Sequence, residues 1–189
     1  VETITELIEY YKGIFTILSS CAARQLEEVT FRRNTIPVQE LFDAAGKYFR
    51  KVMKNRTEKV ELIIEPMEAK VIGDVNQLRF LFENLIDEAL AVREEGVIRL
   101  QARKDNEYIR FLFTDTRREK SVTELNQLFY PNLARMTSGE KGELRGTEYL
   151  VCKQIIRDHD EFAGRRGCRI NAEPAEGGGF TVYFTIPRR

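Results

Sequence analysis

Apolar residues recur at three- and four-residue steps from Asp74 to Val92, which is the spacing of one buried face of an α-helix. Asp74 is a candidate N-cap, and Gln77 stands three residues later, where a capping-box partner would reach back. At about 100° per residue, Gln77, Asn84 and Glu88 fall together on one flank of the apolar face. The pattern therefore predicts a core-facing helix whose polar flank either lines a pocket or is simply solvated.

The same reasoning predicts the other elements. Helical spacing occurs at Ile4–Leu26, at Val38–Val52 after Pro37 at the first helical position, near Val122–Phe129 and at Gly146–His159. Strand patterns occur at Val29–Ile36, Val60–Ile64, Val97–Ala102, Tyr108–Phe113, Cys168–Ala172 and Phe180–Ile186, with turns at Asp105–Asn106 and Gly177–Gly179, and Val71–Gly73 leads into the central helix. This order predicts an α/β (α+β) fold: a two-layer sandwich with a mixed, mostly antiparallel sheet and helices on one face.

The first predicted helix, Ile4–Leu26, is long and one-sided, and only Gly13 interrupts its apolar face. Such a helix at the start of a chain usually packs on another helix, in the same chain or across a dimer. The alternative is that it packs on its own domain. We therefore divide the chain into a helix at residues 1–28 and a domain at residues 29–189.

Composition narrows the classes of function. The 189 residues are 42% hydrophobic, which is enough for a core, and Lys plus Arg equals Asp plus Glu at 30 each, so no net charge favours nucleic acid or an anionic membrane. No apolar run approaches the roughly 20 residues of a membrane span. Cys21, Cys152 and Cys168 are too scattered for a zinc site, and their odd number argues against a disulfide framework, which fits a reducing, cytosolic compartment. Because the chain begins at Val1, we expect it to be an excerpt of a longer protein.

Several motifs in order resemble the ATPase domain of histidine kinases, whose superfamily includes the gyrase, mismatch-repair and heat-shock-chaperone ATPases. Asp74, Gln77–Leu78 and Asn84–Ala89 resemble the N-box helix. Leu128–Pro131 resembles the aromatic box before the lid, Gly146–Thr147 with Lys153–Ile156 resembles the glycine-rich start of the next helix, and Cys168–Pro187 resembles the last hairpin. The resemblance implies a Bergerat-type ATPase fold from about Val29 onward. It also places the N-terminal helix where the second helix of the dimerisation hairpin would be.

The resemblance further implies a site for ATP and magnesium. Asp115 stands directly after a predicted strand, at the place of the aspartate that accepts the adenine amino group. Asn84 is available to a phosphate or to a water that ligates the metal, and Glu88 stands at the place of the magnesium ligand. Gly146 and Thr147 correspond to the helix N-terminus that binds phosphate.

Four departures from the family pattern bear on this site. The run Asp115–Glu119 lacks both glycines of D-x-G-x-G, and a side chain there would crowd the backbone that lies against the nucleotide. Glu88 replaces the second asparagine of the N-box, and Ala91–Val92 removes a phosphate donor. Glu148 replaces a glycine at the phosphate-binding helix. We hypothesise that the Glu148 carboxylate occupies the position of the missing phosphate, where it satisfies the free N–H groups and repels an anion.

Other polar residues have plainer interpretations. His159 is the only histidine, so the residues given include no separate phosphoacceptor, and its place on an apolar face predicts a structural role. The segment Asp160–Gly167 lengthens the usual short turn. A set of basic residues either forms a rim around the lid or is merely solvated, and the second is the commoner case: Arg117, Arg118, Arg135, Lys141 and Arg145.

Two hypotheses follow. The first is an active ATP-binding kinase domain that transfers the γ-phosphoryl group of ATP to a histidine outside this chain. The second, which the missing glycines favour, is a degenerate domain with weak or lost ATP binding and no catalytic residue of its own. It would act in two-component signalling as a homodimer through the N-terminal helix, with a response regulator as a further candidate partner and either ATP and magnesium or no cofactor. Neither hypothesis includes nucleic acid or membrane contact by this segment, and both place it in the cytoplasm, including as the cytosolic part of a membrane-bound sensor.

Overall fold

The computed structural model describes residues 3–8, 11–12, 31–131 and 147–189. From residue 31 onward its elements run in the predicted order, except that residues 70–73, predicted only to lead into the central helix, form a further strand. They are β1 (Asn34–Pro37), α2 (Val38–Met53), β2 (Val60–Ile64), β3 (Lys70–Gly73), α3 (Val75–Leu90), β4 (Gly96–Asp105), β5 (Tyr108–Asp115), α4 (Val122–Asn126), α6 (Glu148–Phe162), β6 (Ile170–Pro174) and β7 (Phe180–Pro187).

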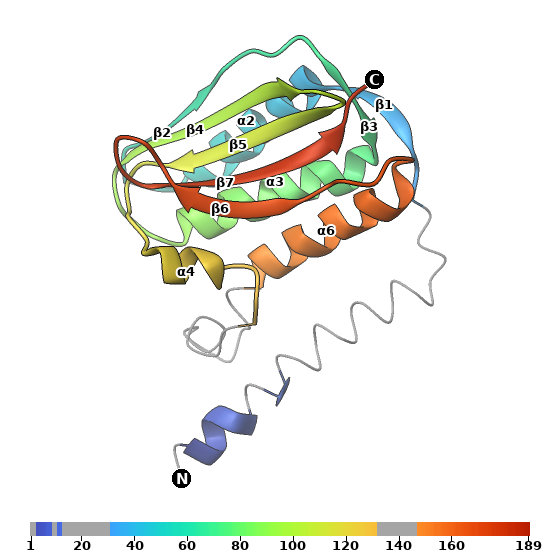
Figure 1. Cartoon of the computed structure of the whole chain (residues 1–189). Coiled ribbons are helices and arrows are strands. Elements are labelled where there is room, and N and C mark those ends of the chain that lie inside the picture. The colour runs from blue at the N-terminus through green and yellow to red at the C-terminus, as the bar shows by residue number, and fades with distance from the viewer. Residues whose placement is uncertain (1–2, 9–10, 13–30, 132–146) are drawn as a thin grey trace.

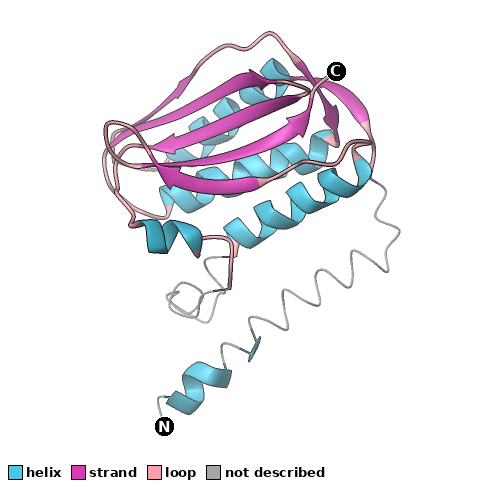
Figure 2. Cartoon of the chain, viewed as in Figure 1, coloured by secondary structure: helices cyan, strands magenta, loops and turns pink. Residues whose placement is uncertain are grey.

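Five strands form the main sheet in the order β2-β4-β5-β7-β6. Strand β2 pairs with β4 in parallel, and the other neighbours are antiparallel. Strands β1 and β3 form a separate antiparallel pair. Helices α2, α3 and α6 lie along one face of the main sheet (Figures 1 and 2). The predicted two-layer α/β fold is therefore confirmed.

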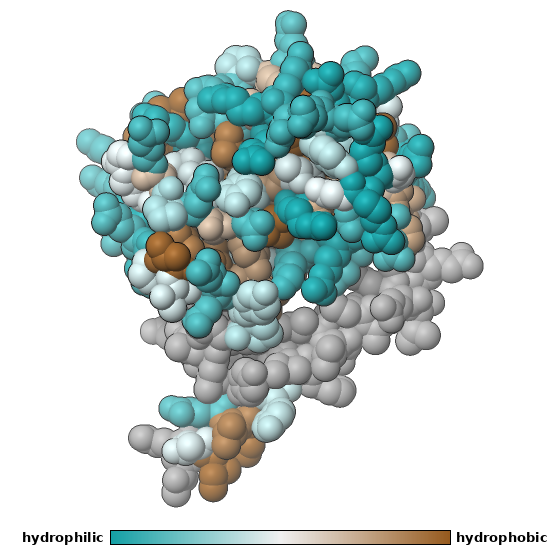
Figure 3. All heavy atoms as spheres, viewed as in Figure 1, coloured by the Kyte–Doolittle hydropathy of each residue, from teal (hydrophilic) through white to brown (hydrophobic). Residues whose placement is uncertain are grey.

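The core lies between the sheet and these helices because each contributes one apolar face. Every second residue of β5 is buried, including Ile109, Phe111 and Phe113. Phe111 stacks on Phe184 of β7 with ring centroids 4.9 Å apart, and Phe82 of α3 packs edge-on to Phe111 at 5.7 Å. These aromatic contacts fix α3 against the centre of the sheet. The molecular surface is mainly hydrophilic in the view of Figure 3.

Of the two hydrogen bonds of the capping box predicted at the start of α3, only the one accepted by the Asp74 side chain is present. The Asp74 side chain accepts hydrogen bonds from the backbone N–H groups of Asn76 and Gln77, as predicted. The predicted return bond from Gln77 is wrong: its Oε1 is buried without a hydrogen-bond partner in the described part of the chain. The reason is that the Asp74 N–H donates instead to Nε2 of His159, at 3.1 Å.

A few boundaries differ from the predictions. Pro37 ends β1 and caps α2 in extended geometry, so the helix begins at Val38 rather than at Pro37. The first hairpin pairs Asp105 with Tyr108, which moves its two-residue turn to Asn106–Glu107. Asn106 has a φ of 54°, a value that asparagine tolerates better than most residues.

The N-terminal helix is described only in part. Residues 3–8 and 11–12 are helical, while the remainder of the predicted Ile4–Leu26 helix, Cys21 included, lies outside the described residues. Among the residues that are described, no helix is both long enough and apolar enough to cross a membrane.

Candidate functional site

Asp115 is the last residue of β5, and its position is fixed from both sides. It pairs with Ile98 of β4 and with Phe180 of β7, and only 4% of it is exposed. Gly179, with a φ of +83°, lies so close that a Cβ there would collide with the Asp115 backbone. The β6–β7 turn therefore needs glycine at this point, and it holds the predicted site aspartate in the interior.

Arg117 occupies the carboxylate of Asp115. Its Nε donates to Oδ1 and its Nη2 donates to Oδ2, each at 2.9 Å, so the pair is bidentate. The Arg117 side chain is 0% exposed and that of Asp115 is 5% exposed. Both oxygens of the predicted adenine acceptor are thus already engaged by a buried guanidinium.

The remaining donors of Arg117 reach the C-terminal end of α3. Nη2 donates to the carbonyl oxygen of Ala89 at 2.5 Å, and Nη1 donates to those of Glu94 at 2.9 Å and Val92 at 3.5 Å. Arg117 consequently ties the end of β5 to the end of α3 and to the loop that follows. A cation at a helix C-terminus is also favoured by the helix dipole.

The solvated or rim position predicted for Arg117 is therefore wrong. It points inward because Asp115 and the last carbonyls of α3 together supply acceptors that would otherwise be buried without donors. Arg118, the next residue, is exposed, as a solvated side chain should be. The other three predicted members of the rim, Arg135, Lys141 and Arg145, lie outside the described residues. One signal in the sequence could have identified Arg117: it stands at the first missing glycine of the D-x-G-x-G pattern.

The polar flank of α3 faces α6. Asn84 is 7% exposed, and its Nδ2 donates to the carbonyl oxygen of Phe80 in its own helix at 2.7 Å. Burial, together with the negative charges of Glu148 and Glu88, raises the pKa of Cys152 on α6. The predicted site residues of α3 therefore lie near the start of α6. The charges of Glu88 and Glu148 that act on Cys152 are both negative.

The start of α6 carries Glu148 as its first helical residue. The preceding N-cap, Thr147, makes no side-chain capping bond, and the predicted Gly146 lies outside the described residues. Oε2 of Glu148 is buried and has no hydrogen-bond partner among the residues described. Burial raises the pKa of Asp87 on α3, and the charge of Glu148 adds to that rise. The Glu148 carboxylate thus lies near enough to α3 to affect Asp87.

These residues give a clear test of fit to ATP. The resemblance makes Asp115 the acceptor of an adenine amino group, and in this structure both of its carboxylate oxygens accept hydrogen bonds from Arg117. A triphosphate at the start of α6 would meet the carboxylate of Glu148. Arg117 and Glu148 thus lie at the two places where the resemblance puts the base acceptor and the phosphate-binding helix start. Nor does the described part of the chain bring together three or more metal-ligating side chains, so Glu88 as a magnesium ligand stays a prediction.

His159 lies at the opposite end of α6 and is 0% exposed. Its Nδ1 is 2.8 Å from the carbonyl oxygen of Ile155, to which it donates, and its Nε2 accepts the Asp74 N–H. Phe31 packs edge-on to the ring at 4.8 Å, and the Arg32 N–H donates to Asp74. Burial lowers the pKa of His159, against the opposing effects of the Ile155 carbonyl and the Asp74 charge. These bonds agree with the structural role predicted for this histidine, while Phe31 and Arg32 were not foreseen.

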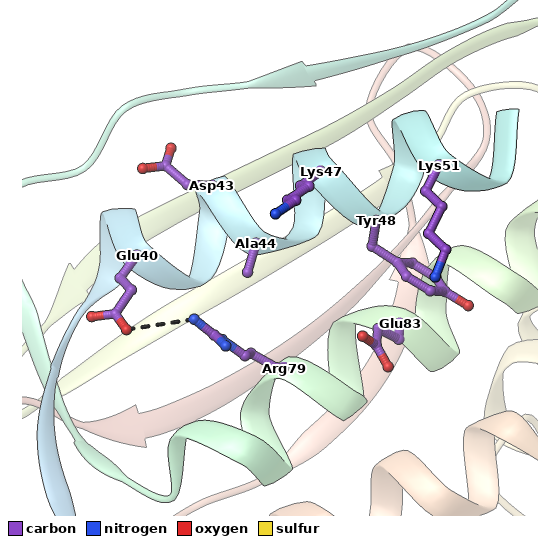
Figure 4. Close-up of a pocket in the computed structure, with 8 residues that line it drawn as sticks. All are labelled: Glu40, Asp43, Ala44, Lys47, Tyr48, Lys51, Arg79 and Glu83. Atoms are coloured by element: carbon purple, nitrogen blue, oxygen red, sulfur yellow. Dashed lines mark ion pairs between the residues drawn. The ribbon is translucent and has the colours of Figure 1, made fainter. Parts of the chain in front are cut away.

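A separate cavity of about 570 Å³ lies between α2 and α3, with Tyr48 at its edge (Figure 4). Its wall is made of Glu40, Asp43, Ala44, Lys47, Tyr48, Lys51, Arg79 and Glu83. Glu40 pairs with Arg79 at 3.6 Å, and the Tyr48 hydroxyl donates to Asp87 at 2.7 Å. Acidic and basic side chains balance along this wall, and none of the predicted site residues belongs to it.

Comparison with known proteins agrees with this fold. Residues 73–189, more than half of the chain, match the family described as "Histidine kinase-, DNA gyrase B-, and HSP90-like ATPase". The signal transduction histidine-protein kinase BaeS of Escherichia coli (strain K12) is 24% identical over 163 residues, which are 84% of this chain and 33% of that protein. The chain thus spans about a third of this curated relative's length.

Solved structures show the same architecture. The mycobacterial sensor histidine kinase MprB matches with a TM-score of 0.63 at 17% identity, covering 84% of this chain and 99% of that one. Histidine kinase ThkA, in its complex with the response regulator protein TrrA, matches with a TM-score of 0.64 at 18% identity, covering 100% of this chain and 52% of that one.

The fold and the family match together define a histidine-kinase-type ATPase domain. The chain belongs to the histidine kinase-, DNA gyrase B- and HSP90-like ATPase family.

Proposed function

We propose that this chain is the ATPase-like domain of a two-component sensor histidine kinase in which ATP binding is weak or lost. The observation that carries the proposal is the buried Asp115–Arg117 pair, with both carboxylate oxygens held at 2.9 Å. Truncating one partner of a buried, hydrogen-bonded ion pair costs about 3–5 kcal/mol, so a ligand that displaced Arg117 would have to offset a penalty of that order. A carboxylate at the start of α6 opposes the phosphates as well.

The role of such a domain in signalling is to dimerise and to present a surface. In the described part of the N-terminal helix, Ile4, Leu7, Ile8 and Tyr11 are each at least 48% exposed, which supports a helix that needs a partner. Residues 1–28 then form the dimerising helix, and residues 29–189 form the ATPase-like domain. A response regulator is the further partner that we propose, by analogy with the ThkA complex.

One experiment tests the loss of ATP binding. Ligand at a hundred times its dissociation constant adds about 2.7 kcal/mol to the stability of the folded state. For a chain of this size that gain raises the melting temperature by about 5–10 °C. We expect a flat series when millimolar ATP or ADP with magnesium is added to the wild-type chain. A clear upward shift would support the alternative, an active domain that transfers the γ-phosphoryl group to a histidine outside this chain.

A variant series sharpens this test. Glu148→Gly removes the carboxylate at the phosphate end, and Arg117→Gly frees Asp115 at the base end. If both ends oppose the nucleotide, the double variant gains more ATP affinity in isothermal titration than either single variant. Tight binding by the wild type that Glu148→Gly leaves unimproved would contradict the role given to Glu148.

A second experiment tests the dimer. Leu7→Asp and Ile8→Asp place charges on the exposed apolar face of the N-terminal helix. We expect each to shift the chain toward a monomer in sedimentation at micromolar concentration, while Glu6→Gln, at an exposed polar position of the same helix, leaves the mass unchanged. A wild-type chain that is monomeric at high concentration would contradict the dimerising role.

A further inference from the structure

The contacts of Arg117 point to more than the loss of a ligand. We propose that Asp115 and the carbonyl oxygens of Ala89, Val92 and Glu94 form a guanidinium-binding seat, that Arg117 is its resident ligand, and that this ligand holds α3 to β5 in place of a bound small molecule. The inference rests on the proposed function in one respect, since it names what fills the site.

Hydrogen bonding in the seat is complete. A guanidinium has five N–H donors in a fixed plane and no acceptor. Five contacts leave the Arg117 guanidinium for these groups: one from Nε, two from Nη1 and two from Nη2. Every group around it is a carboxylate or carbonyl oxygen, and therefore an acceptor. An aminopurine would bring only the two N–H donors of its amino group and would turn ring nitrogens, which accept, toward the remaining oxygens.

The walls are also shaped to an arginine side chain. Gly96, with a φ of +142°, lies against its stem, and a Cβ on Gly96 would be 2.7 Å from Cγ of Arg117. Thr116 fixes the backbone beside it, because both its N–H and its hydroxyl donate to the carbonyl oxygen of Val97, at 3.1 and 2.7 Å. The Arg117 N–H donates to Asp115 at 3.0 Å. The backbone at Thr116 and Arg117 is thus held beside the seat by hydrogen bonds of its own.

The consequence concerns α3. The last carbonyls of a helix have no partner within it and need donors from elsewhere. Here one side chain, 28 residues away from Ala89, bonds to a carbonyl in the last turn of α3 and to two in the loop that leads to β4. The end of α3 is therefore held in place with no bound ligand, and a domain of this kind presents one fixed surface whatever the nucleotide level.

The experiment removes the Arg117 side chain from the guanidinium-binding seat and then adds a small guanidinium compound to replace it. In the full chain we expect Arg117→Ala to lower the melting temperature by about 10 °C, and the exposed neighbour control Arg118→Ala by less than about 2 °C. Millimolar methylguanidinium should restore part of the loss in Arg117→Ala in a saturable way. Tetramethylammonium at equal ionic strength should not, and the wild type should respond to neither. Equal effects of the two alanine variants, or a rescue that does not saturate, would overturn the inference.

A measurement on the wild type covers the case in which Arg117→Ala does not fold. Nitrogen-15 spectra of arginine side chains should show slowly exchanging Nη protons for Arg117, identified as the signal that disappears in Arg117→Lys. Rapid exchange at Arg117, like that at Arg118, would overturn the inference. Tight ATP binding that leaves the Arg117 signal protected would instead overturn the proposed function and leave the seat intact, so the two failures are distinguishable.

Discussion

The two ends of α3 are both closed by distant groups, but in different ways. At the N-terminal end, the Asp74 carboxylate accepts N–H groups from the helix itself and from Arg32, while the Asp74 N–H donates to His159. At the C-terminal end, Arg117 donates to the carbonyls of Ala89 and Glu94 and brings its own counter-ion, Asp115, while Arg56 donates to the carbonyl of Leu90. The N-terminal end is held by hydrogen bonds that involve one charged group, Asp74, whereas a buried ion pair contributes at the C-terminal end.

The difference decides how each end responds to change. A helix cap exchanges one hydrogen bond for another with water and is worth about 1 kcal/mol. A buried ion pair leaves an uncompensated charge when one partner is removed, which costs several times more. We therefore expect the C-terminal end of α3 to be the harder of the two ends to open.

The largest predicted effect is that of Asp115→Ala. It leaves the Arg117 guanidinium buried without its counter-ion, and we expect a loss of about 3–5 kcal/mol in the free energy of unfolding, measured with urea. Asp105→Ala is the matched control, because Asp105 pairs with Arg110 at 3.0 Å but the two side chains are 39% and 44% exposed. That pair should be worth less than about 1 kcal/mol. Equal losses would show that the Asp115–Arg117 pair behaves as a surface pair.

Asp74→Ala should have the next largest effect. It removes the cap of α3 and the bond from the Arg32 N–H, so we expect a loss of about 1–2 kcal/mol by the same measurement. Asn76→Ala, at an exposed position in the first turn, should change stability by no more than about 0.5 kcal/mol. A loss at Asp74 larger than that at Asp115 would reverse the comparison between the two ends.

A smaller effect depends on pH through His159. Its folded-state pKa lies below the ordinary 6.5, so the unfolded chain takes up the proton first. The stability that neutral His159 contributes is then fully present above pH 6.5 and is lost as the pH falls through the folded pKa, with a slope of at most about 1.4 kcal/mol per pH unit. Because the chain has one histidine, His159→Gln should remove this slope between pH 6.5 and about 5. An unchanged slope would assign it to carboxylates.

The smallest predicted effect concerns the charge of Glu148 on α6 and the pKa of Asp87 on α3. Glu148→Gln removes one cause of the raised pKa of Asp87 and should lower that pKa toward its ordinary value in an NMR titration. Glu94→Gln is the control, since it removes the same charge from an exposed position. The same response to both variants would mean that the carboxylate of Glu148 does not face α3.

Local sequence patterns were sufficient to predict the helices and strands and the N-cap of α3. The apolar spacing of α2, α3 and β5 matches the buried faces, because the sheet and the helices each need one apolar side in a two-layer fold. Asp74 as an N-cap followed from its position before the first turn. Asp115 was predicted directly after the strand Tyr108–Phe113, and it is the last residue of β5, which runs two residues further than the predicted strand.

Hydrogen bonds and ion pairs between residues far apart in the chain could not be predicted from the sequence. Arg117 was grouped with solvated arginines because composition and spacing treat a charged side chain as exposed unless its partners are known. The partners here are three carbonyl oxygens and a carboxylate that meet only when β5 and α3 pack together. The same holds for Gln77, whose expected return bond was displaced by His159, 85 residues away from Asp74.

By itself, the sequence determined the spacing of apolar residues and the starts of the helices. From these features and the family motifs, the layered fold and its family could be predicted. Only the tertiary structure decided which partners the predicted site residues have. Secondary structure depends on neighbours within a few positions, whereas the state of Asp115 depends on which donor reaches it in the folded core. In that core an unpaired carboxylate is costly, and the nearest buried cation is Arg117.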